Sequence, residues 1–399
     1  MANTNLTIDM ITRKALMILE NELVLTRNVN RAYDDSFAVE GAKIGSTLRI
    51  RLPNRYPVRT GAALSVTDYV ENKTTLTVST QVGVDLNFTT AELTMAIDDF
   101  AERILKPGLS QVASYIDNDV ANCYGDIWNS VGTPGTAPST SLVLLQAQQK
   151  LNESAAAIRP RYATVNPAAN AALVEGMKGF FNPTGTISSQ FKSGMMGEGV
   201  LGYDEVSMSQ SIATLTTGTQ WTSPTVQTTS TEGDTTLAVQ GTGTWQAKVG
   251  DVFTVASVYA VNPQTRQSTG ALQQFVVTAA TNLTTNGSVS VQPAIYATSG
   301  TPLQTVNRLP TANDVITIYA TASASSPQNL VYHRDAITFA TADLVMPRGV
   351  DMASRQVYNG ISIRLVRQYD INNDRLPCRL DVLYGYKTIR PQMACRIWG

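Results

Sequence analysis

The sequence contains very little histidine. His333 is the single histidine among 399 residues, so a site that needs two imidazole ligands, such as an HExxH zinc centre, is excluded. His333 is then the one residue that could serve as the base of a Ser-His-Asp triad, and no activated nucleophile accompanies it in the sequence. We therefore interpret His333 as a hydrogen-bonded residue and expect no catalytic site, no metal site and no cofactor.

Cysteine and long apolar runs are also scarce. The three cysteines, Cys123, Cys378 and Cys395, form an odd set without CxxC spacing, which fits neither a metal knuckle nor a disulfide framework. The simpler interpretation of these cysteines is that the protein is made in a reducing compartment, where the thiols stay free. The first residues lack a basic stretch followed by an apolar one, and about 18 apolar residues never run together. We expect neither a secretion leader nor a membrane span.

Charge is low as well. Only 15% of the residues are charged, against about 25% in typical soluble domains. Thirty basic and 31 acidic residues leave a net charge of −1, which argues against a dedicated nucleic-acid binder. The glycines at 194–199 and 241–243 do not follow a strand and open a helix, so we interpret both segments as loops and not as phosphate sites.

The low charge is concentrated in one part of the chain. Between Ser211 and Tyr332 the sequence has seven charged residues, and short alternating runs such as Val252–Val258 and Gln274–Thr278 are joined by turn residues. This pattern predicts an all-β barrel or sandwich. Since charge-rich sequence lies on both sides, we expect an insertion into another domain.

The N-terminal third predicts a helix followed by a long arm. From Thr7 to Arg27 apolar residues recur at spacings of three and four, typical of one helix face. Residues 47–52 and 75–88 then alternate between apolar and polar, and the second run would span roughly 40 Å as one strand. We expect a two-stranded arm from 41 to 88, which needs a partner surface because an isolated hairpin is marginally stable.

A long helix should follow the arm. Thr89–Glu92 reads as a capping box, and Pro107 then restarts the helical pattern. Apolar spacing continues to Val131, which predicts a helix of roughly 33 Å. Its expected core residues are Leu109, Val112, Ile116, Val120, Cys123 and Ile127.

The remaining segments predict a mixed α/β part. Residues 142–157 are helix-like, 162–165 strand-like, and Asn166-Pro167 would begin a further helix to Lys178. Near the C-terminus, residues 361–365 and 378–384 read as two strands. The linking segment, Asp370 to Asp374, has partial calcium-loop spacing, but position six is Arg375 instead of glycine, so a hairpin turn is favoured.

Several residues are candidates for contacts between copies of the chain. In the arm these are Arg49, Arg51, Arg55, Arg59, Asp68, Glu71 and Lys73, and in the N-terminal helix Ile8, Ile11, Arg13, Lys14, Leu19 and Leu23. The arginine cluster fits both a solvated strand face and pairing with carboxylates of a neighbour, since exposed pairs contribute only about 0–1 kcal/mol. Asp98 and Asp99 would be the pair to test in a glycosidase, but their spacing favours first-turn helix acids.

Three local stretches, in this order, carry a resemblance to a known family. They are Phe88–Thr94 with Asp98–Phe100, Tyr332–Ala336 leading into Ala342–Leu344, and Arg390–Arg396. The sequence resembles the major capsid proteins of tailed bacteriophages with the Hong Kong 97-like fold, in particular the phage P twenty-two type with an inserted β-barrel. The resemblance covers essentially the whole chain.

The resemblance implies an α+β fold with seven segments. They are an N-terminal arm (1–40), an extended loop (41–88), a peripheral domain with the spine helix (89–139), the first part of an axial domain (140–210), the inserted β-barrel (211–332), the axial return (333–360) and peripheral C-terminal strands (361–399). The long helix predicted from Pro107 to Val131 would be the spine helix of this fold.

The same resemblance implies the function and its partners. The chain would assemble with itself as pentamers and hexamers into an icosahedral shell, together with a scaffolding protein and a portal protein. The shell would enclose double-stranded DNA without sequence specificity, could carry a decoration protein, and would involve no membrane. Assembly would take place in the host cytoplasm and the product would be the virion. The alternative is another virion structural protein, such as a tail or tube subunit.

Overall fold

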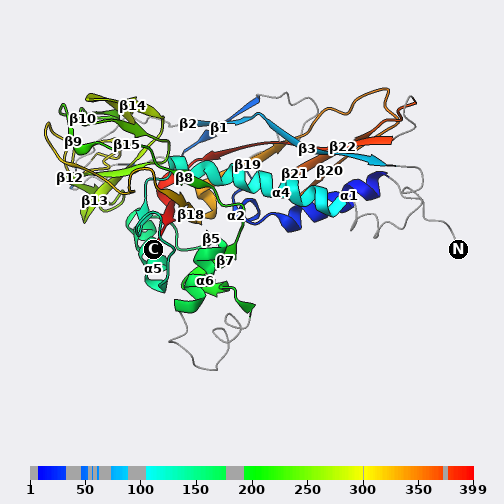
Figure 1. Ribbon diagram of the computed structural model, residues 1–399, viewed down its shortest axis with the longest axis horizontal. Coiled ribbons are helices and arrows are strands. Elements are labelled where there is room, and N and C mark those ends of the chain that lie inside the picture. The colour runs from blue at the N-terminus through cyan, green and yellow to red at the C-terminus, as the bar shows by residue number, and fades with distance from the viewer. Residues whose placement is uncertain are drawn as a thin grey trace. The chain divides into compact units, whose positions relative to one another are not determined.

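The computed structural model describes residues 8–32, 46–52, 56, 61–62, 73–88, 105–176, 193–299, 301–371 and 376–399. The chain divides into two compact units, which are described separately (Figure 1). The first unit comprises Met1–Arg51, Lys73–Val120 and Ile337–Ile389, and the second comprises Leu52–Asn72, Ala121–Ala336 and Arg390–Gly399.

The first unit is a sheet covered by helices. Its helices are α1 (Ile8–Glu22), α2 (Leu25–Asn28) and α4 (Lys106–Ala121), and its strands are β1 (Ser46–Arg51), β2 (Lys73–Val78), β3 (Thr80–Phe88), β19 (Ile337–Ala342), β20 (Met352–Tyr358), β21 (Ile361–Arg367) and β22 (Leu376–Thr388). The strands β19, β22, β21 and β20 are neighbours in that order, and β3 joins β22. All these pairs are antiparallel.

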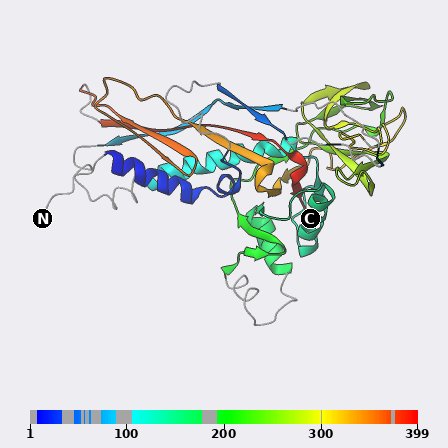
Figure 2. The same ribbon diagram turned by 180° about the vertical axis from the view of Figure 1, so that it is seen from behind.

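The helices of the first unit bury the stripes expected from their sequences. On α1, Ala15 and Leu19 have no exposed surface, and on α4 Leu109, Ile116 and Val120 are at most 1% exposed. Figures 1 and 2 show the two helices side by side along the sheet from both directions. The periodicity therefore identified helices whose apolar faces form part of this unit's core.

The long helix ends earlier than predicted. It stops at Ala121 and continues as a 3-10 helix, η4 (Asn122–Asp126), instead of reaching Val131. Ile127 is extended, and Ser130–Val131 form β4, which pairs in parallel with the C-terminal strand. Gly125 lowers helix propensity here, and the partner strand offers backbone hydrogen bonds that override the apolar spacing.

The predicted single strand over residues 75–88 is divided. Ser79 separates β2 from β3; β2 pairs with β1, whereas β3 pairs with β22 along nine residue pairs. Residues 80–88 are thus part of the sheet and not of a free arm. Alternation identifies which face of a strand is buried, but it carries no information about which strand is the neighbour.

The second unit contains a mixed sheet flanked by helices. Its elements outside the insertion are η4, β4 (Ser130–Val131), α5 (Ser141–Glu153), β5 (Arg161–Val165), α6 (Pro167–Gly176), β6 (Gly197–Val200), β7 (Tyr203–Met208), β18 (Asn329–His333), η6 (Arg334–Ala336), η7 (Pro391–Met393) and β23 (Ala394–Ile397). The strand order is β4-β23-β18-β5-β7-β6. We call this the α/β part of the second unit.

The predicted helix-strand-helix succession is present here. Asn166 precedes α6 and its side-chain oxygen accepts a hydrogen bond from the backbone N–H of Ala169 at 2.9 Å, while Pro167 occupies the first helical position. The strand β5 pairs in parallel with β7. The cap and the proline were therefore sufficient to locate the start of α6.

The insertion is an all-β barrel. Its strands are β8 (Thr214–Thr216), β9 (Thr222–Val226), β10 (Asp234–Thr242), β11 (Trp245–Ala247), β12 (Val252–Val261), β13 (Ser268–Val277), β14 (Thr281–Leu283), β15 (Asn286–Ile295), β16 (Ile316–Ile318) and β17 (Ser325–Pro327). Six of them form a sheet in the order β16-β12-β13-β15-β10-β9. A bridge between Thr225 and Val315 joins its two edges.

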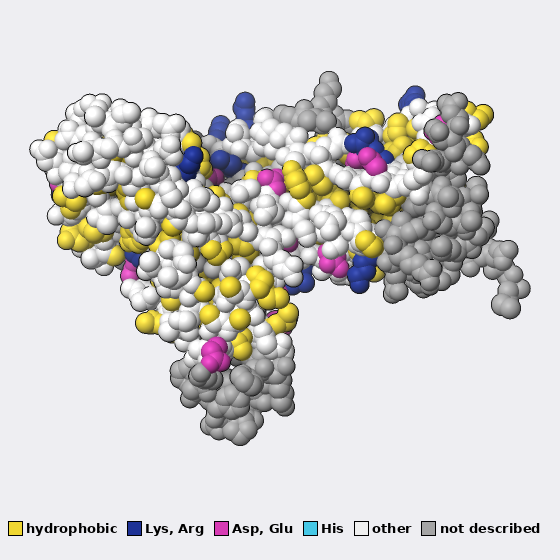
Figure 3. Space-filling view, viewed as in Figure 1, with side chains coloured by type: hydrophobic (Ala, Val, Ile, Leu, Met, Phe, Trp, Pro, Cys, Tyr) yellow, Lys and Arg dark blue, Asp and Glu magenta, His cyan; other side chains and the backbone are white. Residues whose placement is uncertain are grey.

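Aromatic side chains form the centre of this inserted module, residues 214–327. The ring centroids of Trp245 lie 5.6 Å from Trp221 and 6.1 Å from Phe253, and Phe253 stacks on Phe275 at 5.8 Å. On the face drawn in Figure 3 the module shows few charged side chains. Its stability therefore rests on an apolar core and hydrogen-bonded turns, as the low charge of this segment predicts.

Three segment boundaries differ from those expected. The insertion ends at the β8–β17 pair, because β18 belongs to the α/β sheet. Residues 337–342 join the first unit through β22 instead of an axial return. The last residues, Arg390–Gly399, belong to the second unit, where β23 lies between β4 and β18. Each difference concerns a strand whose partner is distant in sequence.

Candidate functional site

The single histidine is used to hold the backbone. Nδ1 of His333 accepts a hydrogen bond from the N–H of Asp335 at 3.1 Å. Nε2 lies 3.2 Å from the carbonyl oxygen of Arg159, so this nitrogen carries the proton and donates it. The ring is 4% exposed. This environment fits the interpretation of a hydrogen-bonded residue.

The cysteines are buried thiols. All three are free. Burial raises the pKa of Cys378 and of Cys395 to about 12 and raises the pKa of Cys123 further. A thiol with such a pKa is protonated at neutral pH and is a poor nucleophile or metal ligand.

The described part of the chain holds no group of three or more His, Cys, Asp or Glu side chains arranged for a metal ion. Asp98 and Asp99, the pair considered for a glycosidase, lie outside the described residues, as do the capping box at 89–92 and residues 372–375. Among the helices that the structure describes, none has the length and hydropathy needed to cross a membrane.

The arm presents cations at one end of the β1–β2 ladder. Arg51 lies opposite Lys73, and Arg49 opposite Thr75; the three basic residues are exposed. Leu76 and Val78 on the other face are fully buried. The remaining candidates in the arm, Arg55, Arg59, Asp68 and Glu71, lie outside the described residues.

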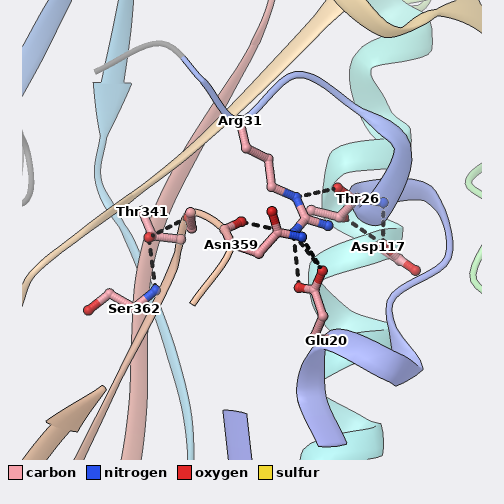
Figure 4. Close-up of polar contacts among 8 residues, drawn as sticks. Glu20, Thr26, Arg31, Asp117, Thr341, Asn359 and Ser362 are labelled. Carbon is pink, nitrogen blue, oxygen red and sulfur yellow. Dashed lines mark hydrogen bonds and ion pairs between the residues drawn. The ribbon is translucent and has the colours of Figure 1, made fainter. Parts of the chain in front are cut away.

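The N-terminal helix is anchored by a buried carboxylate on α4. Asp117 accepts hydrogen bonds from the N–H groups of Val24 at 2.7 Å, Leu25 at 3.3 Å and Thr26 at 2.9 Å, and from the Thr26 hydroxyl at 2.6 Å. These amides belong to the start of α2, where no intrahelical partner exists. Burial raises the pKa of Asp117, although the hydrogen bonds act in the opposite direction. Figure 4 shows this contact.

A second network ties the N-terminal segment, residues 8–32, to the β20–β21 turn. Nη1 of Arg31 lies 3.0 and 2.9 Å from the two carboxylate oxygens of Glu20 and donates to the carbonyl of Asn359 at 3.1 Å. The Asn359 amide donates to Glu20 at 2.8 Å. Figure 4 shows these side chains converging. We call the contacts of Asp117 and Arg31 together the arm anchor, because they hold the segment predicted as the N-terminal arm (1–40).

The arm anchor was not anticipated from the sequence, although one signal was present. Asn359-Gly360 is the dipeptide typical of a two-residue type I′ hairpin turn, and both residues have positive φ, 49° and 76°. Nothing in the sequence relates this turn to Glu20 or Arg31. A buried acid inside a helical stripe, such as Asp117, is a signal for a polar contact, but it does not identify the partner.

The predicted contact residues of the N-terminal helix fall into two groups. Ile11, Leu19 and Leu23 are at most 5% exposed within the chain itself. These side chains therefore pack in the core of the subunit and not on its surface. Arg13 is exposed and Lys14 half-buried. The side chain of Ile8 lies outside the described residues. The residues predicted as the core of the long helix, Leu109, Val112, Ile116, Val120, Cys123 and Ile127, are all buried, although Cys123 and Ile127 lie beyond its end at Ala121.

Large apolar side chains reach the surface of the first unit around one hairpin. Val357 and Tyr358, beside the β20–β21 turn, are 52% and 59% exposed. At the other end Met352, Tyr369 and Ile371 are 43%, 46% and 80% exposed. We call these five residues the hairpin apolar residues. Exposed apolar side chains that lie next to one another, as at each end of this hairpin, are typical of contact surfaces.

Comparison with known proteins gives the family. The profile of the family described as P22 coat protein, gene protein 5, matches residues 1–399. The chain belongs to the P22 coat protein family. It is 22% identical over 414 residues to the major capsid protein of Acyrthosiphon pisum secondary endosymbiont phage 1, with 98% of this chain and 97% of that protein aligned.

Solved structures of low sequence identity are also similar. A structure from Mycobacterium phage Che8 covers 94% of this chain and 90% of its own, with a TM-score of 0.45 and 12% identity. The mature capsid of bacteriophage PhiM1 covers 90% of this chain and 83% of its own, with a TM-score of 0.40 and 11% identity.

Membership of this family confirms the main expectation from the sequence: the chain is a major capsid protein of a phage, a structural protein that forms the shell. The alternative of a tail or tube subunit was wrong. The mixture of helices and sheets in the two units agrees with the α+β, Hong Kong 97-like fold expected for such a coat protein.

Proposed function

We propose that the chain assembles through pentamers and hexamers into the icosahedral procapsid of a tailed phage. In this proposal a scaffolding protein and a portal protein take part in the host cytoplasm, and the shell later encloses double-stranded DNA as part of the virion. A decoration protein would bind the finished shell from outside. No catalytic step is required of the chain itself.

The hairpin apolar residues carry this proposal. Ile371 is 80% exposed and Tyr358 59% exposed, and covering each such side chain would contribute roughly 1.5–3 kcal/mol. One contact of this size is weak, but a closed shell repeats it in every subunit, so that many weak contacts sum to a stable particle. We propose that neighbouring copies cover these residues.

The cationic end of the arm supports a second contact. Arg49, Arg51 and Lys73 are exposed on one ladder, and opposite charges on a neighbour would complement them. Arg13 and Lys14 on α1 are further candidates of the same kind. Such exposed pairs contribute about 0–1 kcal/mol each, so their role would be to select the correct partner surface instead of supplying most of the binding energy.

Sedimentation velocity and negative-stain electron microscopy on the purified chain, with and without its scaffolding protein, test the assembly. Closed shells of uniform size are expected. A monomer that stays stable under both conditions, or open tubes, would contradict the proposal.

A substitution at the most exposed apolar position tests the surface. Ile371→Asp should leave the far-UV circular dichroism and melting temperature of the subunit unchanged, because the side chain makes little contact within the chain, yet it should strongly reduce the yield of shells. Ile371→Val is the matched control and should assemble normally. Equal shell yields from both variants would show that this residue is not in a contact.

A further inference from the structure

Three turns of the inserted module share one design. In each, an aspartate carboxylate accepts a hydrogen bond from the backbone N–H three residues earlier, and the residue before the aspartate has a positive φ of 71–94°. The pairs are Thr231 with Asp234 at 2.7 Å, Lys248 with Asp251 at 2.8 Å and Thr311 with Asp314 at 2.7 Å. Every aspartate of the module is used in this way.

The second carboxylate oxygen distinguishes the turn at Asp251. The second oxygen of Asp234 accepts from the Thr231 hydroxyl at 2.8 Å, and that of Asp314 accepts from Nη2 of Arg308 at 3.0 Å. Lys248 stands where Thr231 stands in the first turn, and it has no hydroxyl. Oδ1 of Asp251 is buried and has no hydrogen-bond partner among the described residues.

A buried cation with spare donors lies at the same place. Arg396 of β23 has no exposed surface. Its Nη1 donates to the carbonyl of Gly250 at 2.7 Å and to the side-chain oxygen of Gln328 at 3.2 Å. The guanidinium also lies over the rings of Tyr124 and Trp398, at 5.9 and 5.4 Å from their centroids. Nε and Nη2 have no partner in the described part of the chain.

The residues that carry these groups line one small cavity. It measures about 10 Å³, and Asp251, Arg396 and Trp398 are among the residues that line it. Nε1 of Trp398 is a further buried donor without a partner in the described residues. The volume is close to the roughly 10–15 Å³ that a single buried water requires. A buried donor or acceptor that is left without a partner loses the hydrogen bonds it made with water in the unfolded chain, so filling the cavity is favourable.

We propose that this cavity is a binding site for one ordered water molecule, which accepts hydrogen bonds from the Arg396 guanidinium and donates one to Oδ1 of Asp251. The water thus mediates an ion pair between β23 and the turn before β12.

The chemistry of the surrounding groups selects water over other small ligands. Arg396 and Trp398 offer N–H donors and therefore need an acceptor, whereas the Asp251 carboxylate needs a donor. A halide ion accepts hydrogen bonds but cannot donate one to Asp251. A metal cation would be repelled by Arg396. Water both accepts and donates, and it makes about three hydrogen bonds when buried.

The site joins segments that are distant in sequence. Arg396 lies on the C-terminal strand, Asp251 belongs to the inserted module, and Gln328 lies next to the β8–β17 pair where the insertion ends. Gln274 of β13 makes a similar link, because its amide both accepts from the N–H and donates to the carbonyl of Ser130. The water would therefore complete the polar contact that fixes the inserted module to the α/β part.

An experimental map of the full-length chain, crystallised or assembled into shells and at a resolution that shows buried water, is the primary test. We expect one peak within about 2.7–3.2 Å of Arg396 and of Oδ1 of Asp251. An empty cavity in a map that shows other buried waters would overturn the proposal, as would direct contact between the two side chains. Anomalous signal at this position after bromide soaking would do the same.

Two variants at Lys248 provide a matched comparison. Lys248 is exposed, so its replacement should leave the fold intact. Lys248→Thr would introduce the hydroxyl found at Thr231 and satisfy Oδ1 of Asp251 directly, so the peak should weaken or lose its contact with Asp251. Lys248→Val has nearly the same shape without a hydroxyl and should keep the peak. Identical density in both variants would contradict the role assigned to Asp251.

Discussion

The two units differ in how they accommodate buried arginines. In the first unit the Arg31 and Arg364 side chains, 5% and 16% exposed, each lie against a carboxylate: Arg31 is 2.9 Å from Glu20 and Arg364 is 2.7 Å from Asp381. In the second unit Arg161 and Arg396 have no exposed surface, yet neither has a carboxylate within ion-pair distance among the described residues. Arg161 donates instead to the carbonyls of residues 156 and 157 and to Asn152.

The difference separates two uses of the same side chain. A direct ion pair in the interior is costly to break, because the remaining charge is left buried. An arginine that donates to carbonyls leaves no opposite charge behind when it is removed, and its main effect is to hold loop backbone in place. The first unit should therefore be more sensitive to loss of a carboxylate than the second unit is to loss of an arginine.

The largest effect is expected for Asp381→Ala. Asp381 is 1% exposed and lies 2.7 Å from Arg364 and from Arg379. Its removal leaves the Arg364 side chain, which is 16% exposed, without its counterion and should destabilise the first unit by about 3 kcal/mol. Urea unfolding followed by far-UV circular dichroism measures this. All four tryptophans lie in the second unit, so their fluorescence should change little at low urea.

Asp381→Leu combined with Arg364→Leu is the control for that prediction. Replacing both members by apolar residues should recover most of the lost stability. A single variant that loses less than about 1 kcal/mol would show that the pair contributes no more than a surface ion pair.

A smaller loss, about 1–3 kcal/mol, is expected for Arg161→Met. The variant loses hydrogen bonds to Ala157, Ala156 and Asn152 at 2.7–3.0 Å, but no buried carboxylate is left alone. Tryptophan fluorescence in urea measures the second unit. Arg159→Met is the matched control, since that side chain is 73% exposed and should change stability by less than about 0.5 kcal/mol. A loss as large as for Asp381→Ala would refute the distinction.

The pH dependence of the second unit sharpens the comparison further. Burial raises the pKa of Asp251 to about 6 from an ordinary 3.8. The folded state therefore holds the proton of the Asp251 carboxyl group more tightly than the unfolded state does. The stabilisation of the folded state by this protonated carboxyl is complete below about pH 4 and is lost as pH rises through about 6. The change should amount to about 1–3 kcal/mol.

Asp251→Asn should remove this slope, as seen by tryptophan fluorescence at several pH values between about 4 and 7. Asp234→Asn, in a turn of the same design with an exposed carboxylate, should retain it. The interpretation fails if wild type and Asp251→Asn lose stability equally over this range.

The smallest effect belongs to a pair of the first unit whose carboxylate, unlike that of Asp381, is exposed. Arg367 lies 3.0 Å from Asp351, whose side chain is 43% exposed. Solvent screens this pair, so Asp351→Asn should cost less than about 1 kcal/mol. Circular dichroism in urea, compared directly with Asp381→Ala, provides the check. A cost above about 2 kcal/mol would mean that exposure is a poor guide to the importance of these pairs.

Sequence periodicity located the elements whose stabilisation is local. The stripes of α1 and α4, the cap and proline of α6, and the alternating strands of the inserted module are properties of neighbouring residues. Each pattern reports which face of an element is buried. The low charge between Ser211 and Tyr332 likewise indicated a separate module, because few charges fit a segment held together by an apolar barrel core.

The same patterns could not predict which strands pair with one another. Ser79 divides an apparently continuous strand because β1 and β22 offer different neighbours on either side of it. The arm anchor unites Glu20, Arg31, Asp117 and Asn359, and the closest pair in sequence among them is 11 residues apart. The side chains of Arg396 and Asp251 are likewise brought together only by the packing of the inserted module on β23.

The sequence by itself determined the helices, the inserted all-β module and the absence of paired histidines, because these depend on composition and on spacings of a few residues. It indicated the class of protein through the resemblance of its ordered local stretches to a known family. Only the tertiary structure decided the end of α4, the assignment of the last strand to the second unit and the partners of the buried charges. These depend on backbone and side-chain hydrogen bonds between distant segments, which become favourable only when packing removes the groups from water.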